Sequence, residues 1–553
     1  MENSLNETDS ALEETKTSHR DTDEEDSKAQ IDDSGNQGST KRMDGSLRRM
    51  SRNLSKTLTR QSSSIAEALP ETTTGWTVFT SVILSAILGY EVQLQRRLTH
   101  PPVTFCQNAT GSVIEQVYKK LTESPDHILS RSIAPSLFVG TRGTISSTAA
   151  YLMGGPSSVS KKYMRFREII TMSQDGANIA IDWEIPLQPK QETSNSKEQQ
   201  VDQSKCKSEI LEGPIQKPVV IILHGINNDA SFGYMKSLQR TFCDRGWNAA
   251  SMNFRGTAIR LTTPRGYNGA YTGDLRSLVY HIAGRMAPNV PIFLVGNSLG
   301  ANIMTKYLGE EGLAGTLPSC VAGGASLGNP LLLDSSNVKF PFSVLMALGV
   351  KKIYLDNWKS IRALKDDYSR QSFHTGLMAS TIEAVDNAVA PIFIRNDEFY
   401  PYGVKIGYRN GEHYWFDASS YRHVRHISVP FLNLTAQDDF LVSRPSRNKL
   451  GYCIGNPNVM VVETRCGGHL GWQESPPDTA FGSSSWADVA TADFFDAVMK
   501  TNTELCGTAI GHNETETVTP YESSVVGLGN MEKDLKQIQK DSIAFQQTVK
   551  PRL

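Results

Sequence analysis

The sequence lacks a strong excess of charge of either sign. Its 56 lysines and arginines nearly balance 58 aspartates and glutamates, which gives a formal net charge of −2. A nucleic-acid-binding protein usually carries a clear basic excess, so this composition argues against a nucleic-acid partner. With 553 residues, 39% of them apolar, the chain can bury one large core and still carry appendages.

The chain also lacks paired cysteines and internal repeats. Its seven cysteines are scattered along the sequence, and none forms a C-x-x-C pair. This spacing predicts neither a disulfide framework nor a zinc site, although one or two bridges are compatible with it. We therefore expect no metal, and cysteine usage does not identify a compartment.

The first seventy or so residues have almost no aromatic and few branched aliphatic side chains. Residues 1–40 are acidic, and the next twenty are basic. Neither block can bury enough apolar surface to offset its ordering entropy, so residues 1–71 are predicted to be a disordered tail. The basic block could lie on anionic lipid, with Ser51 as a kinase site, but a solvated run of charge is the simpler interpretation.

One long uncharged run spans residues 72–90. Nineteen residues in a helix cover about 28 Å, close to the ~30 Å hydrocarbon core of a bilayer. Trp76 and Tyr90 stand near its ends, and Arg96 and Arg97 follow. We expect a single-pass transmembrane helix here, in the endoplasmic reticulum or another membrane, with its orientation open. The alternative is a buried or interfacial helix, because threonines and serines lower the hydrophobicity of the run.

Beyond a linker and N-terminal extension at 91–164, apolar runs alternate with helical stretches. Residues 165–186 read as a hairpin that turns at Asp175 and Gly176. Near-continuous apolar strands such as P-V-V-I-I-L-H-G and P-I-F-L-V-G alternate with helices, which indicates a mostly parallel sheet covered on both faces.

Together with the serine elbow and the Ser, Asp, His order described below, this pattern predicts an α/β-hydrolase fold over residues 165–506. Residues 333–425 interrupt the alternation, so we expect an inserted cap there. A polar C-terminal tail, 507–553, follows the last predicted helix.

The nucleophile candidate is Ser298, in G-N-S-L-G between an apolar strand and a helix. That context suits a G-x-S-x-G elbow, in which glycines permit a sharp turn and the serine sits at a helix N-terminus. Gly324–Gly328 also matches the pattern around Ser326, but Pro330 follows at once. A proline there prevents a helix from starting at the serine, so Ser326 is interpreted as a strand-end serine.

The partners of a serine nucleophile appear in the order Ser, Asp, His. A hydroxyl needs an adjacent imidazole to take its proton. His469 follows the strand N-V-M-V-V-E-T, and either Asp438 or Asp439, after V-P-F-L-N-L-T, could orient its ring. The backbone amides of Ile226 and Leu299 are the expected oxyanion donors, and neighbouring His224 is interpreted as structural.

The matching motifs extend well beyond the elbow. They are I-T-M-S-Q-D-G, L-H-G-I, N-F-R-G-T, T-T-P-R-G-Y-N-G-A-Y-T-G-D-L, G-N-S-L-G, Y-W-F-D-A-S-S, I-S-V-P-F-L-N-L-T-A-Q-D-D and G-G-H-L-G. Through them, residues 165–500 resemble the α/β-hydrolase-domain proteins one to three, which include fungal medium-chain ethyl-ester synthases and bacterial relatives. The resemblance implies an N-terminally anchored lipase or esterase acting on medium- or long-chain acyl esters, with monoacylglycerols, phospholipids and ethyl esters in the family's range.

The resemblance also selects among the site residues. The family's acid is the second aspartate of A-x-D-D-P, which falls on Asp439, although Phe440 stands where proline is usual. The oxyanion loop reads I-N-N-D where many relatives have more glycine. Asn253, Arg255 and Asp274 match the family and are expected to hold loops in place.

The sequence therefore predicts a serine hydrolase that works through an acyl-enzyme without any cofactor. Its expected partners are a lipid or acyl-ester substrate and a membrane, and its oligomeric state is undetermined. Two alternatives stay open: an acyltransferase that passes the acyl group to an alcohol, and a catalytically silent lipid-binding module.

Overall fold

A computed structural model describes ten ranges of the chain. The predicted tail 1–71 and residues 511–553 lie outside them, and the chain divides into two compact units, Met1–Ala86 and Ile87–Leu553. The described ranges are 73–106, 112–152, 162–187, 203–334, 338–363, 367–393, 408, 410–442, 449–474 and 485–510.

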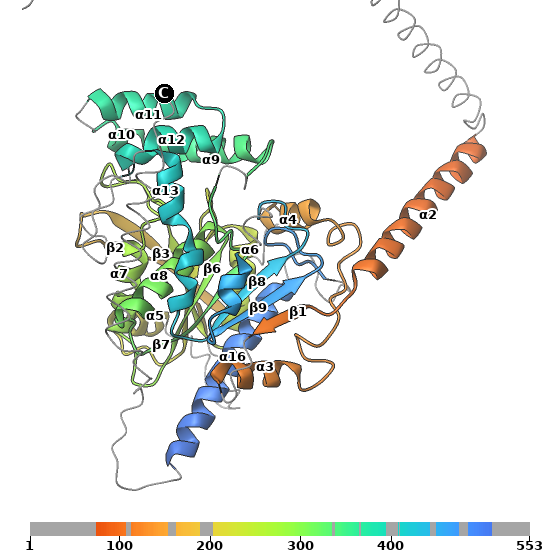
Figure 1. Ribbon diagram of the computed structural model, residues 1–553, viewed down its shortest axis with the longest axis horizontal. Helices are drawn as coiled ribbons and strands as arrows, with labels where there is room; N and C mark the ends of the chain where they lie inside the picture. The colour runs from red at the N-terminus through yellow and green to blue at the C-terminus, as the bar shows by residue number, and fades with distance from the viewer. Residues whose placement is uncertain are drawn as a thin grey trace, which may run out of the picture. The chain divides into compact units, whose positions relative to one another are not determined.

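A nine-stranded sheet forms the centre of the second unit (Figure 1). Its order is β1-β9-β8-β7-β6-β4-β5-β3-β2, and the pairs from β9 through β5 are parallel, while β1, β3 and β2 pair antiparallel. This mostly parallel sheet confirms the predicted fold class. The strands are β1 (Val103–Cys106), β2 (Tyr163–Thr171), β3 (Asn178–Pro186), β4 (Val219–Leu223), β5 (Asn248–Asn253), β6 (Ile292–Asn297), β7 (Val321–Leu327), β8 (Phe431–Ala436) and β9 (Val459–Thr464).

Successive residues of a strand point to opposite faces of the sheet, so a strand of apolar residues exposes apolar side chains on both faces. Helices cover both faces and bury these side chains. In β4, Val220 and Ile222 face the core beneath α3 (Val113–Thr122), α6 (Gly233–Asp244) and α16 (Trp486–Ile510). Ile221 and Leu223 face the opposite core, which is covered by four other helices. Those helices are α5 (Gln203–Glu212), α7 (Gly273–Ala283), α8 (Leu299–Ala314) and α15 (Leu450–Ile454).

The two edges of the sheet come from the N-terminal part of the domain. β2 and β3 form the expected hairpin, in which Gly176 adopts φ of +70° at the turn. At the other edge, β1 pairs with β9 and so brings part of the segment predicted as a linker into the sheet. The following α4 (Gly143–Leu152) lies near α6.

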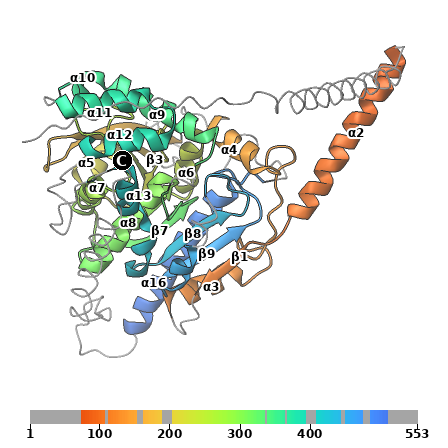
Figure 2. The ribbon, with the colours of Figure 1, turned by 45° about the horizontal axis from the view of Figure 1, so that its top comes forward.

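Five helices between residues 342 and 418 gather above one end of the sheet (Figures 1 and 2). They have an apolar core of their own, which includes Ala347, Phe373, Val385 and Val389. These helices lie inside the interval where a cap is expected. They are α9 (Phe342–Asp356), α10 (Trp358–Ile361), α11 (Asp367–Met378), α12 (Ile382–Phe393) and α13 (Gly411–Ala418), and two short 3-10 turns, Ser420–Arg422 and Val424–His426, lead back to β8.

The prediction of a single-pass transmembrane helix is wrong. From Thr73 onward the uncharged run is helical, as part of α2 (Thr73–Leu98), but no helix in the described ranges is long and apolar enough to cross a membrane. Threonine and serine hydroxyls interrupt the run, and those of Thr80 and Ser81 bond back to the carbonyl of Thr77. A run without charge therefore had the right length but insufficient hydrophobicity.

Candidate active site

Ser298 stands at a strained turn between β6 and α8. Its backbone adopts φ of +53° and ψ of −117°, which non-glycine residues rarely do and which costs about 1–3 kcal/mol. Its amide donates to the carbonyl of Leu327 in the neighbouring strand, with N and O 2.9 Å apart. The turn thereby holds the hydroxyl at the N-terminus of α8, above the carboxyl ends of the parallel strands.

The two glycines of the G-x-S-x-G pattern are required by close backbone contacts. A Cβ on Gly296 would lie 2.5 Å from the Cα of Ala301, and one on Gly300 would lie 2.5 Å from the carbonyl oxygen of His224. Any side chain at either position would push α8 away from the strands. The sequence can form the elbow because both positions lack a Cβ.

Ser298, His469 and Asp439 form a hydrogen-bonded chain. Nε2 of His469 lies 2.7 Å from Oγ of Ser298, and Nδ1 lies 2.8 Å from Oδ2 of Asp439. The second carboxylate oxygen of Asp439 accepts the backbone amides of Leu441 and Val442 at 2.8 and 3.0 Å. All three side chains are at least nine-tenths buried, so the hydrogen bonds between them are shielded from bulk water.

Asp438 faces away from the imidazole. Its Oδ1 accepts the amide of Gly468 at 2.8 Å, next to His469, and burial raises the pKa of its carboxyl above the ordinary value. The structure therefore brings Asp439, and not Asp438, to the ring. Phe440 packs against Phe342 of α9 with ring centroids 4.4 Å apart and against His469 at 6.5 Å.

Ser147 of α4 contributes to the site, although no sequence motif contains it. Its hydroxyl accepts the amide of His469 at 2.7 Å and donates to the carbonyl of Gly143 at 2.7 Å. The loop and α4 approach closely, since a Cβ on Gly468 would lie 2.1 Å from the carbonyl oxygen of Gly143. The only sequence signal is the run of small residues in G-T-I-S-S-T-A-A, which permits such an approach.

The two expected oxyanion donors lie beside the serine. Ile226 and Leu299 line the same pocket as Ser298 and His469, and in the described ranges neither amide has a hydrogen-bond acceptor. The amide of Gly225 is already used, because it donates to the hydroxyl of buried Tyr234 at 2.9 Å. The arrangement leaves two free backbone donors next to the Ser298 hydroxyl, as stabilisation of an oxyanion requires.

His224 and Ser326 occupy structural positions. The amide of Phe254 donates to Nε2 of His224 at 3.0 Å, and Nδ1 lies 2.7 Å from the carbonyl of Gly225. Burial lowers the pKa of His224 to about 4, so the ring stays neutral at pH 7. Ser326 is buried in β7 and donates to Oδ1 of Asn433 at 2.6 Å.

Arg255 and Asn253 hold loops near the site. The buried guanidinium of Arg255 forms ion pairs with Asp274 at 2.6 Å and Asp175 at 2.5 Å, tying the end of β5 to α7 and to the β2–β3 turn. Oδ1 of Asn253 accepts the amide of Ala230 at 2.9 Å. These contacts join segments that are far apart in the sequence around one end of the sheet.

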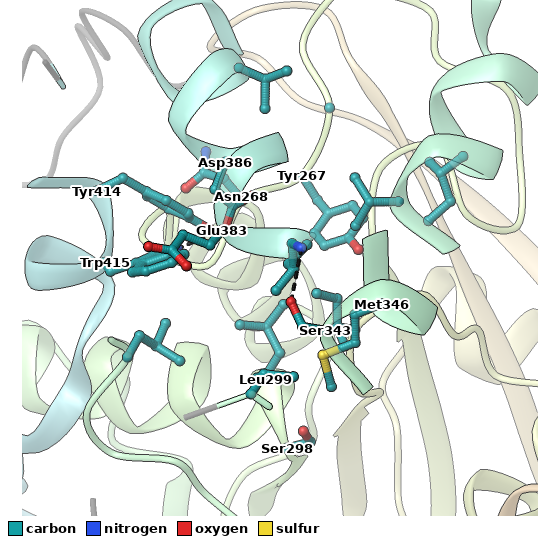
Figure 3. Close-up of a pocket in the computed structure, with 18 of the residues that line it drawn as sticks. Tyr267, Asn268, Ser298, Leu299, Ser343, Met346, Glu383, Asp386, Tyr414 and Trp415 are labelled. Carbon is teal, nitrogen blue, oxygen red and sulfur yellow. Dashed lines mark hydrogen bonds between the residues drawn. The ribbon is translucent and has the colours of Figure 1, made fainter. Parts of the chain in front are cut away.

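The pocket above Ser298 is lined mainly by apolar side chains, many of them from the helices between residues 342 and 418. In Figure 3, Ser298 and Leu299 lie at one end of the labelled residues, and Glu383, Asp386 and Trp415 lie toward the other. Trp415 donates to Asp386 at 2.7 Å, and burial raises the pKa of that carboxyl to about 7. The apolar lining includes Leu261, Leu333, Val338, Met346, Val350 and Ile382. In the described ranges, no group of three or more metal-ligating side chains is present.

Comparisons with known proteins agree with this fold. Residues 214–381 match the family described as serine aminopeptidase, S33. Embryogenesis-associated protein EMB8 of Picea glauca is 27% identical over 66% of this chain and 72% of its own length. Monoacylglycerol lipase of Saccharomyces cerevisiae is 29% identical over 46% of this chain and 55% of its own length. Phospholipase ABHD3 of Mus musculus is 27% identical over 58% of this chain and 69% of its own length.

These matches and the mostly parallel sheet support an α/β-hydrolase family for this chain. They confirm the resemblance drawn from the motifs. The family and its lipase members support a carboxylic ester hydrolase acting on lipid esters in general.

Proposed function

We propose that this protein hydrolyses carboxylic esters of medium- or long-chain acyl groups, with Ser298, His469 and Asp439 as its catalytic residues. The observation that carries the proposal is the 2.7 Å contact between Oγ of Ser298 and Nε2 of His469. A hydroxyl this close to an imidazole can lose its proton as it attacks a carbonyl. The similarity to a yeast monoacylglycerol lipase and a mouse phospholipase supports a lipid ester as substrate.

The reaction proceeds through an acyl-enzyme. Oγ of Ser298 attacks the ester carbonyl carbon while Nε2 of His469 takes the hydroxyl proton, and the amides of Ile226 and Leu299 donate to the oxyanion. His469 then gives the proton to the departing alcohol. Water, deprotonated by the same nitrogen, attacks the acyl-enzyme, and His469 returns that proton to Oγ of Ser298 as the acid is released. Asp439 stays ionised and stabilises the imidazolium.

The pocket supports an acyl chain as the part of the substrate that the cap binds. Its aliphatic lining would remove a medium or long chain from water, at about 0.8 kcal/mol for each buried CH₂. A silent lipid-binding module would also need such a lining. However, it would not need a serine held at positive φ in hydrogen bond with a histidine, an arrangement that costs stability.

A fluorophosphonate probe tests the proposal, because it reacts only with a serine whose base and oxyanion donors are assembled. The wild-type protein should label, Ser298→Ala should abolish labelling, and Ser326→Ala should label nearly as well as the wild type. Ser326→Ala is a matched control, since it removes a serine from the same sequence pattern. Folded wild-type protein that does not label would favour the silent module, and labelling that survives Ser298→Ala would exclude Ser298 as the nucleophile.

Graded substrates then test the acyl preference. The kcat/KM of p-nitrophenyl esters should rise from the acetate to the octanoate. A steady fall with chain length would contradict an acyl-binding pocket under the cap.

Adding an alcohol and measuring ester formation against acid release distinguishes the acyltransferase from the hydrolase.

A further inference from the structure

The oxyanion loop, Gly225–Asn228, is fastened on two sides. On the side of the core, Tyr234 accepts the amide of Gly225 at 2.9 Å and donates to Oδ1 of Asn228 at 3.1 Å. Ile226, whose amide is a proposed oxyanion donor, lies between these contacts and those of Asn227. Its position is therefore set by both neighbours.

Asn227 makes the contacts on the side of the cap. Its Nδ2 donates to the carbonyl of Met346, in the second turn of α9, at 2.9 Å. Its backbone amide donates to the hydroxyl of Tyr267 at 3.3 Å, and the same hydroxyl lies 3.4 Å from its Oδ1. Tyr267 and Met346 line the pocket that contains Ser298 (Figure 3).

The backbone of Asn227 adopts φ of +63°. Glycine adopts this left-handed conformation without strain, and asparagine tolerates it better than most residues. Asparagine has more backbone strain than glycine in this conformation, but it adds a side chain that glycine cannot supply. That side chain makes the bond to α9.

Gly349 allows the contact. A Cβ on this residue would lie 2.3 Å from Nδ2 of Asn227 and 2.6 Å from its Cγ. Glycine within a helix is less favourable than alanine by about 1 kcal/mol, so its presence in α9 needs a reason. Close approach of the Asn227 side chain supplies one.

We propose that Asn227 is a positioning residue, which fixes the Ile226 amide by bonding the oxyanion loop to α9 of the cap. The inference rests on the proposed function, because it assigns a role in stabilising the oxyanion on Ser298. An oxyanion donor lowers the barrier only if it already points at the place where charge develops. Without the bond to Met346, the amide of Ile226 is still present, but on the cap side the loop keeps only the bond from the Asn227 backbone amide to Tyr267.

A double-mutant cycle tests the inference. The variants are Asn227→Gly, Gly349→Ala and the double variant, with Asn289→Gly as matched control. Asn289 also has φ of +63° but is exposed and outside the pocket, so this control removes the same side chain from the same backbone conformation. Turnover of p-nitrophenyl octanoate and inhibition by an octyl trifluoromethyl ketone are measured for each. The ketone forms a tetrahedral adduct whose oxyanion needs the same donors.

Asn227→Gly should lower kcat roughly ten-fold and change KM less than about three-fold. This loss is smaller than the 10²–10³ expected for outright removal of a donor. The inhibition constant of the ketone should rise by the same factor as kcat falls, which a general loss of stability would not produce. Asn289→Gly should match the wild type in both measurements.

Gly349→Ala should be harmful only while Asn227 is present. In the wild-type background its Cβ displaces the Asn227 side chain, so we expect a loss similar to that of Asn227→Gly. The double variant should be no worse than Asn227→Gly alone, because the obstructing atoms are gone. Losses that multiply in the double variant, or wild-type kinetics in Asn227→Gly, would overturn the inference.

The controls separate this inference from the proposed function. Folded wild-type protein that neither hydrolyses esters nor labels would refute both. A wild-type protein that turns over normally, together with an Asn227→Gly variant that behaves like it, would refute only the role of Asn227.

Discussion

Replacing Asp439 by asparagine should disable the histidine by reversing its tautomer. The backbone amides of Leu441 and Val442 both donate to Oδ1 of Asp439. They would hold the carbonyl oxygen of a new asparagine in that place and turn its NH₂ group toward His469. Nδ1 of His469 would then have to accept a hydrogen bond, so that the proton moves to Nε2. A protonated Nε2 cannot take the proton of Ser298.

The expected loss is large and lies in the chemical step. An imidazole held in the wrong tautomer lowers kcat by about 10⁴, equivalent to about 5.5 kcal/mol of barrier. KM should change little, because Asp439 does not line the pocket. The fold should survive, since the amide has the size of the carboxylate and keeps the two backbone hydrogen bonds.

The neighbouring Asp438→Asn is the matched control. An asparagine oxygen can still accept the amide of Gly468, and weakening that hydrogen bond by about 1 kcal/mol corresponds to about a five-fold effect. Steady-state hydrolysis of p-nitrophenyl octanoate and thermal melting of both variants provide the comparison. Equal losses in kcat, or a larger loss for Asp438→Asn, would refute the assignment of Asp439 as the partner of His469.

Two further predictions concern the elbow and the pocket. Gly300→Ala should reduce stability by about 3 kcal/mol or more and abolish labelling of Ser298, because its Cβ would lie 2.5 Å from the carbonyl oxygen of His224. Gly451→Ala should do neither, because among the described residues its Cβ would meet nothing within 4 Å beyond its chain neighbours and its own helix backbone, and calorimetry and the probe check both outcomes. Asp386→Asn should raise the melting temperature at pH 8. The native carboxyl has a pKa of about 7 and the unfolded one about 3.8, so the unfolded state releases its proton first and wild-type stability falls between these pH values, by at most about 4 kcal/mol. A melting difference that persists at pH 3.5 would contradict this origin.

The sequence by itself determined the fold class and the order of the candidate catalytic residues along the chain. Apolar runs separated by helical stretches predicted the parallel sheet, because a strand buried on both faces has few polar positions. Ser298 could be distinguished from Ser326 because Pro330 prevents a helix at the second elbow pattern. His469 was found because it follows the last strand of the sheet. These features are local, so neighbouring residues are enough to reveal them.

The run at 72–90 shows where a local feature was insufficient. Its length and lack of charge matched a bilayer, but membrane insertion depends on the summed hydropathy of the whole run. The hydroxyl-bearing residues of α2 lower that sum below what a spanning helix needs.

Only the tertiary structure decided which groups meet at the site. Asp438 and Asp439 are adjacent, and the loop after β8 determines which carboxylate reaches His469. Ser147 contacts His469 although it lies 322 residues earlier in the sequence. Met346 contacts Asn227 from 119 residues later in the sequence. Such contacts leave no trace in local sequence patterns, because they depend on how α4 and the cap pack against the sheet. Packing of distant segments therefore sets the orientation of the catalytic groups, while local sequence sets their identity.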